Sequence, residues 1–144
     1  MSDLSVRTLD AADLDLFNRY PYPPTSGVGK RSRTFDEYVA VGDYRPEWTW
    51  VAVRDGVVIA RAAFWGPTEA PHPFSLDWFD PGTSPDRVEV GATLLRTAYA
   101  AITASGYAAA PHPGANRPDY HLFLPADWRE RPDAYADATD RIDA

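Results

Sequence analysis

Cysteine is absent from the sequence, and its absence excludes disulfide bonds, thiolate metal sites and a cysteine nucleophile. The three histidines, His72, His112 and His121, do not have the spacing of metal ligands on one helix, and no pattern of carboxylates joins them. The Gly-x-Ser-x-Gly motif that carries a nucleophilic serine in many hydrolases is also missing. We therefore expect neither a metal ion nor a covalent nucleophile in this protein.

Positive charge is scarce, because 14 Lys and Arg residues stand against 21 Asp and Glu residues and the formal net charge is −7. Nucleic-acid binding needs a basic surface, so we expect no nucleic-acid partner. No apolar run approaches the roughly 20 residues of a membrane-spanning helix. Residues 1–4 lack the charged and apolar blocks of a signal peptide. These features predict a soluble, cytoplasmic protein without a membrane partner.

The residues that are present suit a single globular domain over residues 1–144, because 44% of them are hydrophobic and 13% are aromatic. Apolar periodicity and turn residues predict nine elements in the order β-α-α-β-β-β-α-β-α, which is an α/β (α+β) fold class. The expected ranges are 5–9, 11–20, 35–41, 48–54, 57–65, 74–79, 85–104, 120–124 and 132–144.

Local signals mark the ends of several elements. The segment Thr34–Glu37 is a capping box, Asp55-Gly56 is a two-residue hairpin signal, and Ser84-Pro85 caps the long helix. One helix face is expected to be buried, formed by Val88, Gly91, Leu95, Ala98, Tyr99 and Ile102. Strict alternation in the strand 74–79 predicts one face with Phe74, Leu76 and Trp78 and another with Ser75, Asp77 and Phe79.

The order of elements resembles the GNAT N-acetyltransferase superfamily over essentially the whole chain. The stretches Tyr44–Ala52 and Leu76–Asp80 resemble the N-terminal half of actinobacterial proteins with two GNAT-like domains in tandem. The resemblance implies a mixed, mainly antiparallel central sheet flanked by helices, with the helix 85–104 at the cofactor. The two closing strands of the family are absent after the last helix. The resemblance therefore implies a second GNAT-like domain, or a partner copy in a homodimer that completes the sheet.

The segment Arg87-Val88-Glu89-Val90-Gly91-Ala92 aligns with the family's R/Q-x-x-G-x-G/A loop, which holds the pyrophosphate of acetyl-CoA. The resemblance implies acetyl-CoA or another acyl-CoA as cofactor, with the backbone near Phe79 at the pantetheine arm. Three residues would hold the pyrophosphate, namely Arg87, Gly91 and Ala92. Backbone N–H groups at a helix start favour such an anion. Val90 replaces the first glycine, and a β-branched side chain obstructs phosphate, so a plain core helix is the alternative.

Asp77 is the candidate for proton transfer. Its carboxylate lies in an aromatic strand between Leu76 and Trp78, where partial desolvation favours a general base. In an acyltransferase, such a base would deprotonate the ammonium group of a small-molecule amine before the amine attacks the thioester. The alternative is a structural aspartate that is hydrogen-bonded to a turn or to an arginine.

Tryptophans are the candidates for substrate contact. Trp50, Trp65 and Trp78 fall on neighbouring predicted strands and could line a groove for an apolar or cationic ligand. The alternative is that they pack in the core.

Two functions remain open from the sequence. The first is an acyl-CoA-dependent N-acyltransferase, here an acetyltransferase, with Asp77 as base. The second is a catalytically degenerate GNAT-like module with a structural, dimerisation or small-ligand-binding role. The fold alone does not choose between them, because function resides in the site.

Overall fold

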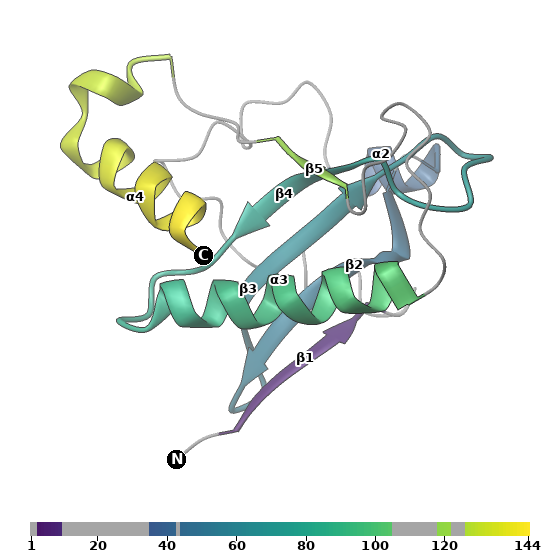
Figure 1. The fold of residues 1–144 in the computed structure, drawn as a ribbon, viewed down its shortest axis with the longest axis horizontal. Coiled ribbons are helices and arrows are strands. Elements are labelled where there is room, and N and C mark those ends of the chain that lie inside the picture. The colour runs from purple at the N-terminus through teal and green to yellow at the C-terminus, as the bar shows by residue number, and fades with distance from the viewer. Residues whose placement is uncertain (1–2, 10–34, 43, 105–117, 122–125) are drawn as a thin grey trace.

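The computed structural model describes residues 3–9, 35–42, 44–104, 118–121 and 126–144, which form a mixed α+β fold (Figure 1). Its sheet has the strand order β1-β2-β3-β4-β5, in which β1 to β4 are antiparallel and β5 is parallel to β4. The strands are β1 (Leu4–Thr8), β2 (Tyr44–Arg54), β3 (Val57–Trp65), β4 (Ser75–Asp80) and β5 (Asp119–Tyr120). The helices are α2 (Phe35–Ala40), α3 (Arg87–Ala104) and α4 (Pro132–Asp143), and a 3-10 turn, η3 (Trp128–Glu130), precedes α4.

The predicted combination of a mainly antiparallel sheet with helices is confirmed for these residues. β3 matches its predicted range, and α4 ends one residue before its predicted end. Strands β1, β4 and β5 each begin one residue away from the predicted start. The predicted helix 11–20, residue Thr34 of the capping box and residues 122–124 lie outside the described part. None of the described helices is long and apolar enough to span a membrane.

The hairpin of β2 and β3 turns at Asp55 and Gly56, as predicted. Both residues have positive φ angles, 53° and 75°, which is the geometry of a type I′ turn. The prediction that β2 starts at Trp48 is wrong, because the strand begins at Tyr44. The pairing of β2 with β3 is irregular between Tyr44 and Thr49, so the side chains there do not alternate regularly between the two faces. The alternation of apolar residues in the sequence therefore did not reveal the first part of the strand.

Strand β4 contains a bulge at Asp77. Phe64 of β3 stands opposite Leu76 and Ala63 stands opposite Trp78, which leaves Asp77 as the additional residue. The bulge resets the alternation of side chains along the strand. The predicted grouping of Leu76 with Trp78 is therefore wrong, because Leu76 shares a core with Phe79 and Trp78 packs on the opposite face.

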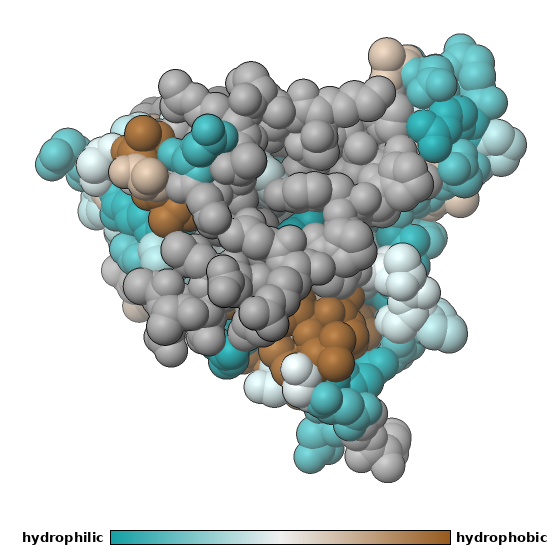
Figure 2. Space-filling model, turned by 180° about the vertical axis from the view of Figure 1, so that it is seen from behind, coloured by the Kyte–Doolittle hydropathy of each residue, from teal (hydrophilic) through white to brown (hydrophobic). Residues whose placement is uncertain are grey.

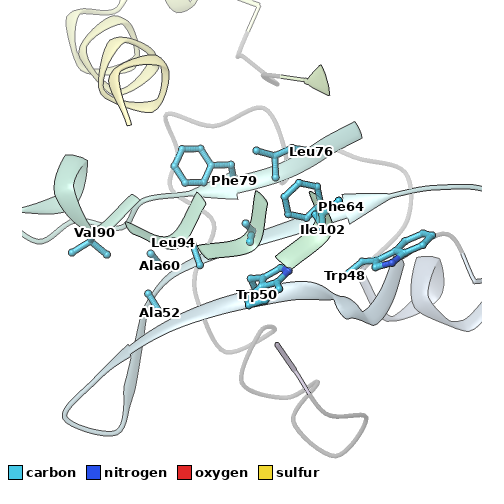
Figure 3. Close-up of a cluster of buried hydrophobic side chains, with 12 residues drawn as sticks. Trp48, Trp50, Ala52, Ala60, Phe64, Leu76, Phe79, Val90, Leu94 and Ile102 are labelled. Carbon is cyan, nitrogen blue, oxygen red and sulfur yellow. The ribbon is translucent and has the colours of Figure 1, made fainter. Parts of the chain in front are cut away.

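Helix α3 covers one face of the sheet and forms the larger core with it (Figures 1 and 3). The helix begins at Arg87, two residues later than predicted, after a turn in which the Arg87 amide donates to Ser84. The buried side chains of the helix that join this core are Val90, Leu94, Ala98 and Ile102. The predicted stripe is wrong at Val88, Leu95 and Tyr99, which are only partly buried, because the helix faces the sheet along one i, i+4 row.

The opposite face of the sheet carries a second, smaller core. Its buried members are Leu9, Tyr44, Val51, Ala63 and Trp78. Both faces of the β2–β3 hairpin are therefore covered by apolar packing, as the lack of a polar face predicted. Figure 2 shows the molecule from behind the view of Figure 1, with an apolar patch exposed among polar residues.

Gly91 is the point of closest packing on α3. A Cβ atom at this position would lie 2.9 Å from Phe79 Cζ, 2.9 Å from Ala144 Cβ and 3.0 Å from Pro81 Cβ. The glycine thus allows the helix to approach the end of β4 and the end of α4.

We predict that Gly91→Ala destabilises the protein. Overpacking costs about 1–3 kcal/mol, which exceeds the gain in helix propensity of about 1 kcal/mol. Urea unfolding should show a lower midpoint than the wild type. Ala100→Gly, at an exposed position of the same helix, measures the effect of helix propensity alone, because no packing changes there. A Gly91→Ala variant more stable than the wild type would contradict the close packing.

Candidate functional site

Asp77 is the centre of a polar cluster on the face of the sheet away from α3. Its carboxylate accepts a hydrogen bond of 2.9 Å from the Tyr44 hydroxyl and one of 2.7 Å from the Ser75 hydroxyl. The Nδ1 atom of His121 lies 3.0 Å from the same oxygen that Ser75 contacts. The Asp77 side chain is only 9% exposed, so these polar partners compensate for the loss of water around the carboxylate.

His121 follows β5 directly and connects this cluster to solvent. Its backbone amide donates to the Leu76 carbonyl at 2.8 Å, which holds the residue beside the bulge of β4. Its side chain is 57% exposed, although Nδ1 is engaged by Asp77. From the sequence, His121 was weighed only as a metal ligand. Its place after Tyr120 in a strand, facing the side opposite to that residue, is the signal that could have found it.

A cleft of about 570 Å³ lies on the α3 face, at the same junction of β4 and β5. Its walls come from the two strands, from α3 and from the last turn of α4, and include Leu76, Tyr120, Ala92, Leu95, Arg96 and Ile142. The Tyr120 ring packs edge-on against Phe79, with centroids 5.8 Å apart. Its hydroxyl oxygen is buried without a hydrogen-bond partner in the described part of the chain. Burial raises the pKa of the Tyr120 phenol, so the group stays protonated in neutral solution.

Buried ion pairs tie α4 to β4 and to the start of α3. Asp137 of α4 binds both Arg87 and Arg141, the latter at 2.8 Å. Arg141 also donates to the Phe79 carbonyl and lies 3.5 Å from Asp80. Burial alone would raise the pKa of Asp137, but the two guanidinium groups outweigh it and hold the pKa below its usual value.

This network occupies residues that the sequence analysis assigned to the cofactor. Arg87 is paired with Asp137, the carbonyl of Phe79 accepts from Arg141, and Gly91 is filled by packing. Of the four residues that were expected to hold the cofactor, Ala92 lines the cleft. Val90, whose side chain was expected to obstruct phosphate, is instead turned into the core (Figure 3).

Arg96 is a cation at the cleft that the sequence analysis missed. It is exposed, and it lines both the 570 Å³ cleft and a second one of about 350 Å³. Its neighbour Arg54 is paired with Asp86 at 2.8 Å, a contact that lowers the pKa of Asp86 to about 2. Arg96 has no ion-pair partner among the described residues. Arg96 stands four residues after Ala92, and residues four apart share one face of a helix. This spacing is the signal in the sequence that could have placed Arg96 beside Ala92.

The tryptophans do not form one groove in the described part of the chain. Trp50 lies in the core under α3, whereas Trp78 lies in the core on the opposite face. Trp65 is partly buried and packs against the core of Trp78. The structure thus brings Trp65 and Trp78 to one side of the sheet and separates Trp50 from them.

No known protein family, curated protein or solved structure matches this chain. Among the described residues, no three His, Asp or Glu side chains are grouped to hold a metal ion. The arrangement instead offers a cleft on one face of the β4–β5 junction and an Asp–His pair on the other.

We predict that Asp137→Asn destabilises the protein by about 3 kcal/mol, because it removes the buried carboxylate that Arg87 and Arg141 share and leaves them, among the described residues, only the longer ion pairs with Asp140 and Asp80. The pKa of Asp137 is lower in the folded state than in the unfolded state. The contribution of its charge to the free energy of unfolding is therefore complete above the ordinary Asp pKa of about 4, and it is lost as the pH falls through the lower pKa of the folded state. Urea unfolding at pH 7 should show the full difference from the wild type, which should narrow below about pH 4.

Asp127→Asn is the matched control for this prediction, because Asp127 forms an exposed pair with Arg131 at 3.8 Å. It should change stability little at either pH. Equal stability of Asp137→Asn and the wild type at pH 7 would show that the buried ion pairs do not hold α4.

Proposed function

We propose that this chain is a GNAT-like acyltransferase domain that transfers an acyl group, such as acetyl, from acyl-CoA to the amine of a small molecule. The observation that carries the proposal is the β4–β5 junction, which has a cleft on its α3 face and the Asp77–His121 pair on its opposite face. Bulges are frequent next to active sites, and the bulge at Asp77 lies at this junction.

The cleft accounts for the acyl-CoA side of the reaction. Its volume of about 570 Å³ lies within the range of small-molecule sites. Leu95 and Tyr99, which are partly exposed, offer apolar surface to a pantetheine arm, and the Tyr120 hydroxyl offers a buried donor. Arg96 is the exposed cation that would contact a phosphate of the ligand, in place of the paired Arg87.

The opposite face accounts for the amine side. The Asp77–His121 pair supplies a proton acceptor near the strand junction, and the enzyme would gain most of its rate from holding the amine against the thioester carbon. Trp65 lies on this face and is partly exposed, so it remains a candidate for substrate contact, whereas Trp78 is buried in the core.

Specific contacts favour a second candidate, a catalytically degenerate GNAT-like module. Arg87, Gly91 and the Phe79 carbonyl make structural contacts that an acyl-CoA would have to replace. In this case the domain would serve a structural or dimerisation role, or bind another small ligand in the cleft. A second copy or a second GNAT-like domain would then pair with the sheet beyond β5.

We predict that acetyl-CoA binds the cleft and that Arg96→Gln weakens the binding. Loss of a charged hydrogen bond costs about 1.5–3 kcal/mol, so the Kd should rise about tenfold or more. Isothermal titration calorimetry measures both constants. Arg129→Gln is the control, since the Arg129 guanidinium lies over the Trp128 ring rather than in the cleft.

The two candidates give different results in this experiment. No heat with millimolar acetyl-CoA, together with a dimer in light scattering, would support the degenerate module and overturn the acyltransferase. Saturable binding that Arg96→Gln weakens and Arg129→Gln leaves unchanged supports the acyltransferase.

A further inference from the structure

We infer that His121 is the proton acceptor of this site, and that Asp77 is the positioning residue that orients its imidazole ring. The proton transfer rests on the proposed acyl transfer, whereas the orientation of the ring does not. This assignment differs from the expectation drawn from the sequence, in which Asp77 itself was the base.

The surroundings of Asp77 leave it poorly placed to meet a substrate. Its carboxylate is nearly buried and already receives the hydroxyl groups of Tyr44 and Ser75 as well as His121 Nδ1. These partners belong to β2, to β4 and to the residue that follows β5, so three separate parts of the chain hold the carboxylate. A substrate amine would have to displace one of these partners to reach it.

His121 has the complementary placement. Its ring is more than half exposed, its backbone is held by Leu76, and Nδ1 faces a carboxylate. In a neutral imidazole, one nitrogen carries the proton and the other accepts one, and a carboxylate at Nδ1 selects the tautomer with the proton there. The lone pair is then on Nε2, at the end of the ring away from Asp77. This is the division of roles by which an aspartate orients the histidine base in a catalytic triad.

The proton balance follows from this geometry. His121 Nε2 takes one proton from the substrate ammonium group, and the free amine forms a C–N bond with the thioester carbonyl carbon as the C–S bond breaks. The leaving thiolate receives the proton from Nε2, and the second proton of the amine passes to solvent. The products are the amide, the CoA thiol and one free proton, and His121 returns to its starting state.

The groups around His121 are consistent with a base oriented from one side. Among the described residues, the charged or titratable groups that face it are Asp77 from β4 and, behind the carboxylate, Tyr44 from β2. The Ser75 hydroxyl is the remaining polar neighbour of the pair. Within the described residues, the charge that orients the ring is therefore the carboxylate of Asp77, which a single substitution removes.

The orientation can be tested without any ligand, by long-range ¹H–¹⁵N NMR of the histidine rings above pH 7.5. His121→Gln identifies the signals of this ring by their loss. The wild type should show the proton on Nδ1, and Asp77→Asn should shift the ring toward the tautomer with the proton on Nε2. A wild-type ring with its proton on Nε2, or an Asp77→Asn ring with unchanged tautomer, would overturn the inference.

The proton transfer is tested by release of CoA thiol from acetyl-CoA, with spermidine, tyramine and water as acceptors. His121→Gln should lower kcat by about 10²- to 10⁴-fold, while the Kd for acetyl-CoA in calorimetry stays unchanged. The ascending limb of the wild-type pH profile should vanish in His121→Gln and change in Asp77→Asn. His72→Gln, at a loop histidine outside the cluster, is the matched control and should retain the wild-type rate.

The outcomes separate this inference from the proposed function. Full turnover by His121→Gln overturns His121 as the base, whatever the NMR result. No binding of acetyl-CoA overturns the acyltransferase proposal and with it the proton transfer, and the NMR result then decides the orienting role of Asp77 alone.

Discussion

The bulge at Asp77 in β4 is the constraint on which the arrangement of the molecule depends. One additional residue in this strand turns both Asp77 and Trp78 away from α3 and returns Phe79 to the core beneath the helix. Because a sheet has a period of two, an unbulged strand would exchange the faces of Trp78 and Phe79. The bulge directly follows Leu76, whose carbonyl accepts the hydrogen bond from the His121 amide. The bulge therefore determines both the packing of the core and the geometry of the Asp77–His121 pair.

The buried carboxylates of Asp137 and Asp77 have different surroundings, which give them different roles. Asp137 and its arginines connect α4, α3 and β4, and their pairing is a structural requirement because an unpartnered buried charge is costly. The carboxylate of Asp77 instead contacts, among the described residues, two hydroxyl groups and an imidazole that reaches solvent. The first group holds the cleft wall in place, and the second presents a titratable ring at the junction.

Local signals were sufficient for much of the fold and for little of the site. Asp55-Gly56, the apolar run of β3 and the proline-led helix α4 were all readable, because each depends on neighbours in the chain. The faces of β4 and the buried row of α3 were misread, because a bulge and a packing direction depend on distant partners. Asp77 was singled out correctly as a desolvated carboxylate, but its partners Tyr44 and His121 lie 33 and 44 positions away.

By itself, the sequence determined the mixed α+β class, the hairpin and the candidate strand around Asp77, since propensity, turn chemistry and hydrophobic period act over a few residues. Only the tertiary structure decided that Arg87 pairs with Asp137, that Gly91 serves packing and that His121 meets Asp77. Those outcomes follow from which strands and helices become neighbours, and β5 reaches β4 as a parallel strand only after the chain has passed through α3. Ion pairs and hydrogen bonds act over a few ångströms in space, so the spacing of residues along the chain does not reveal them.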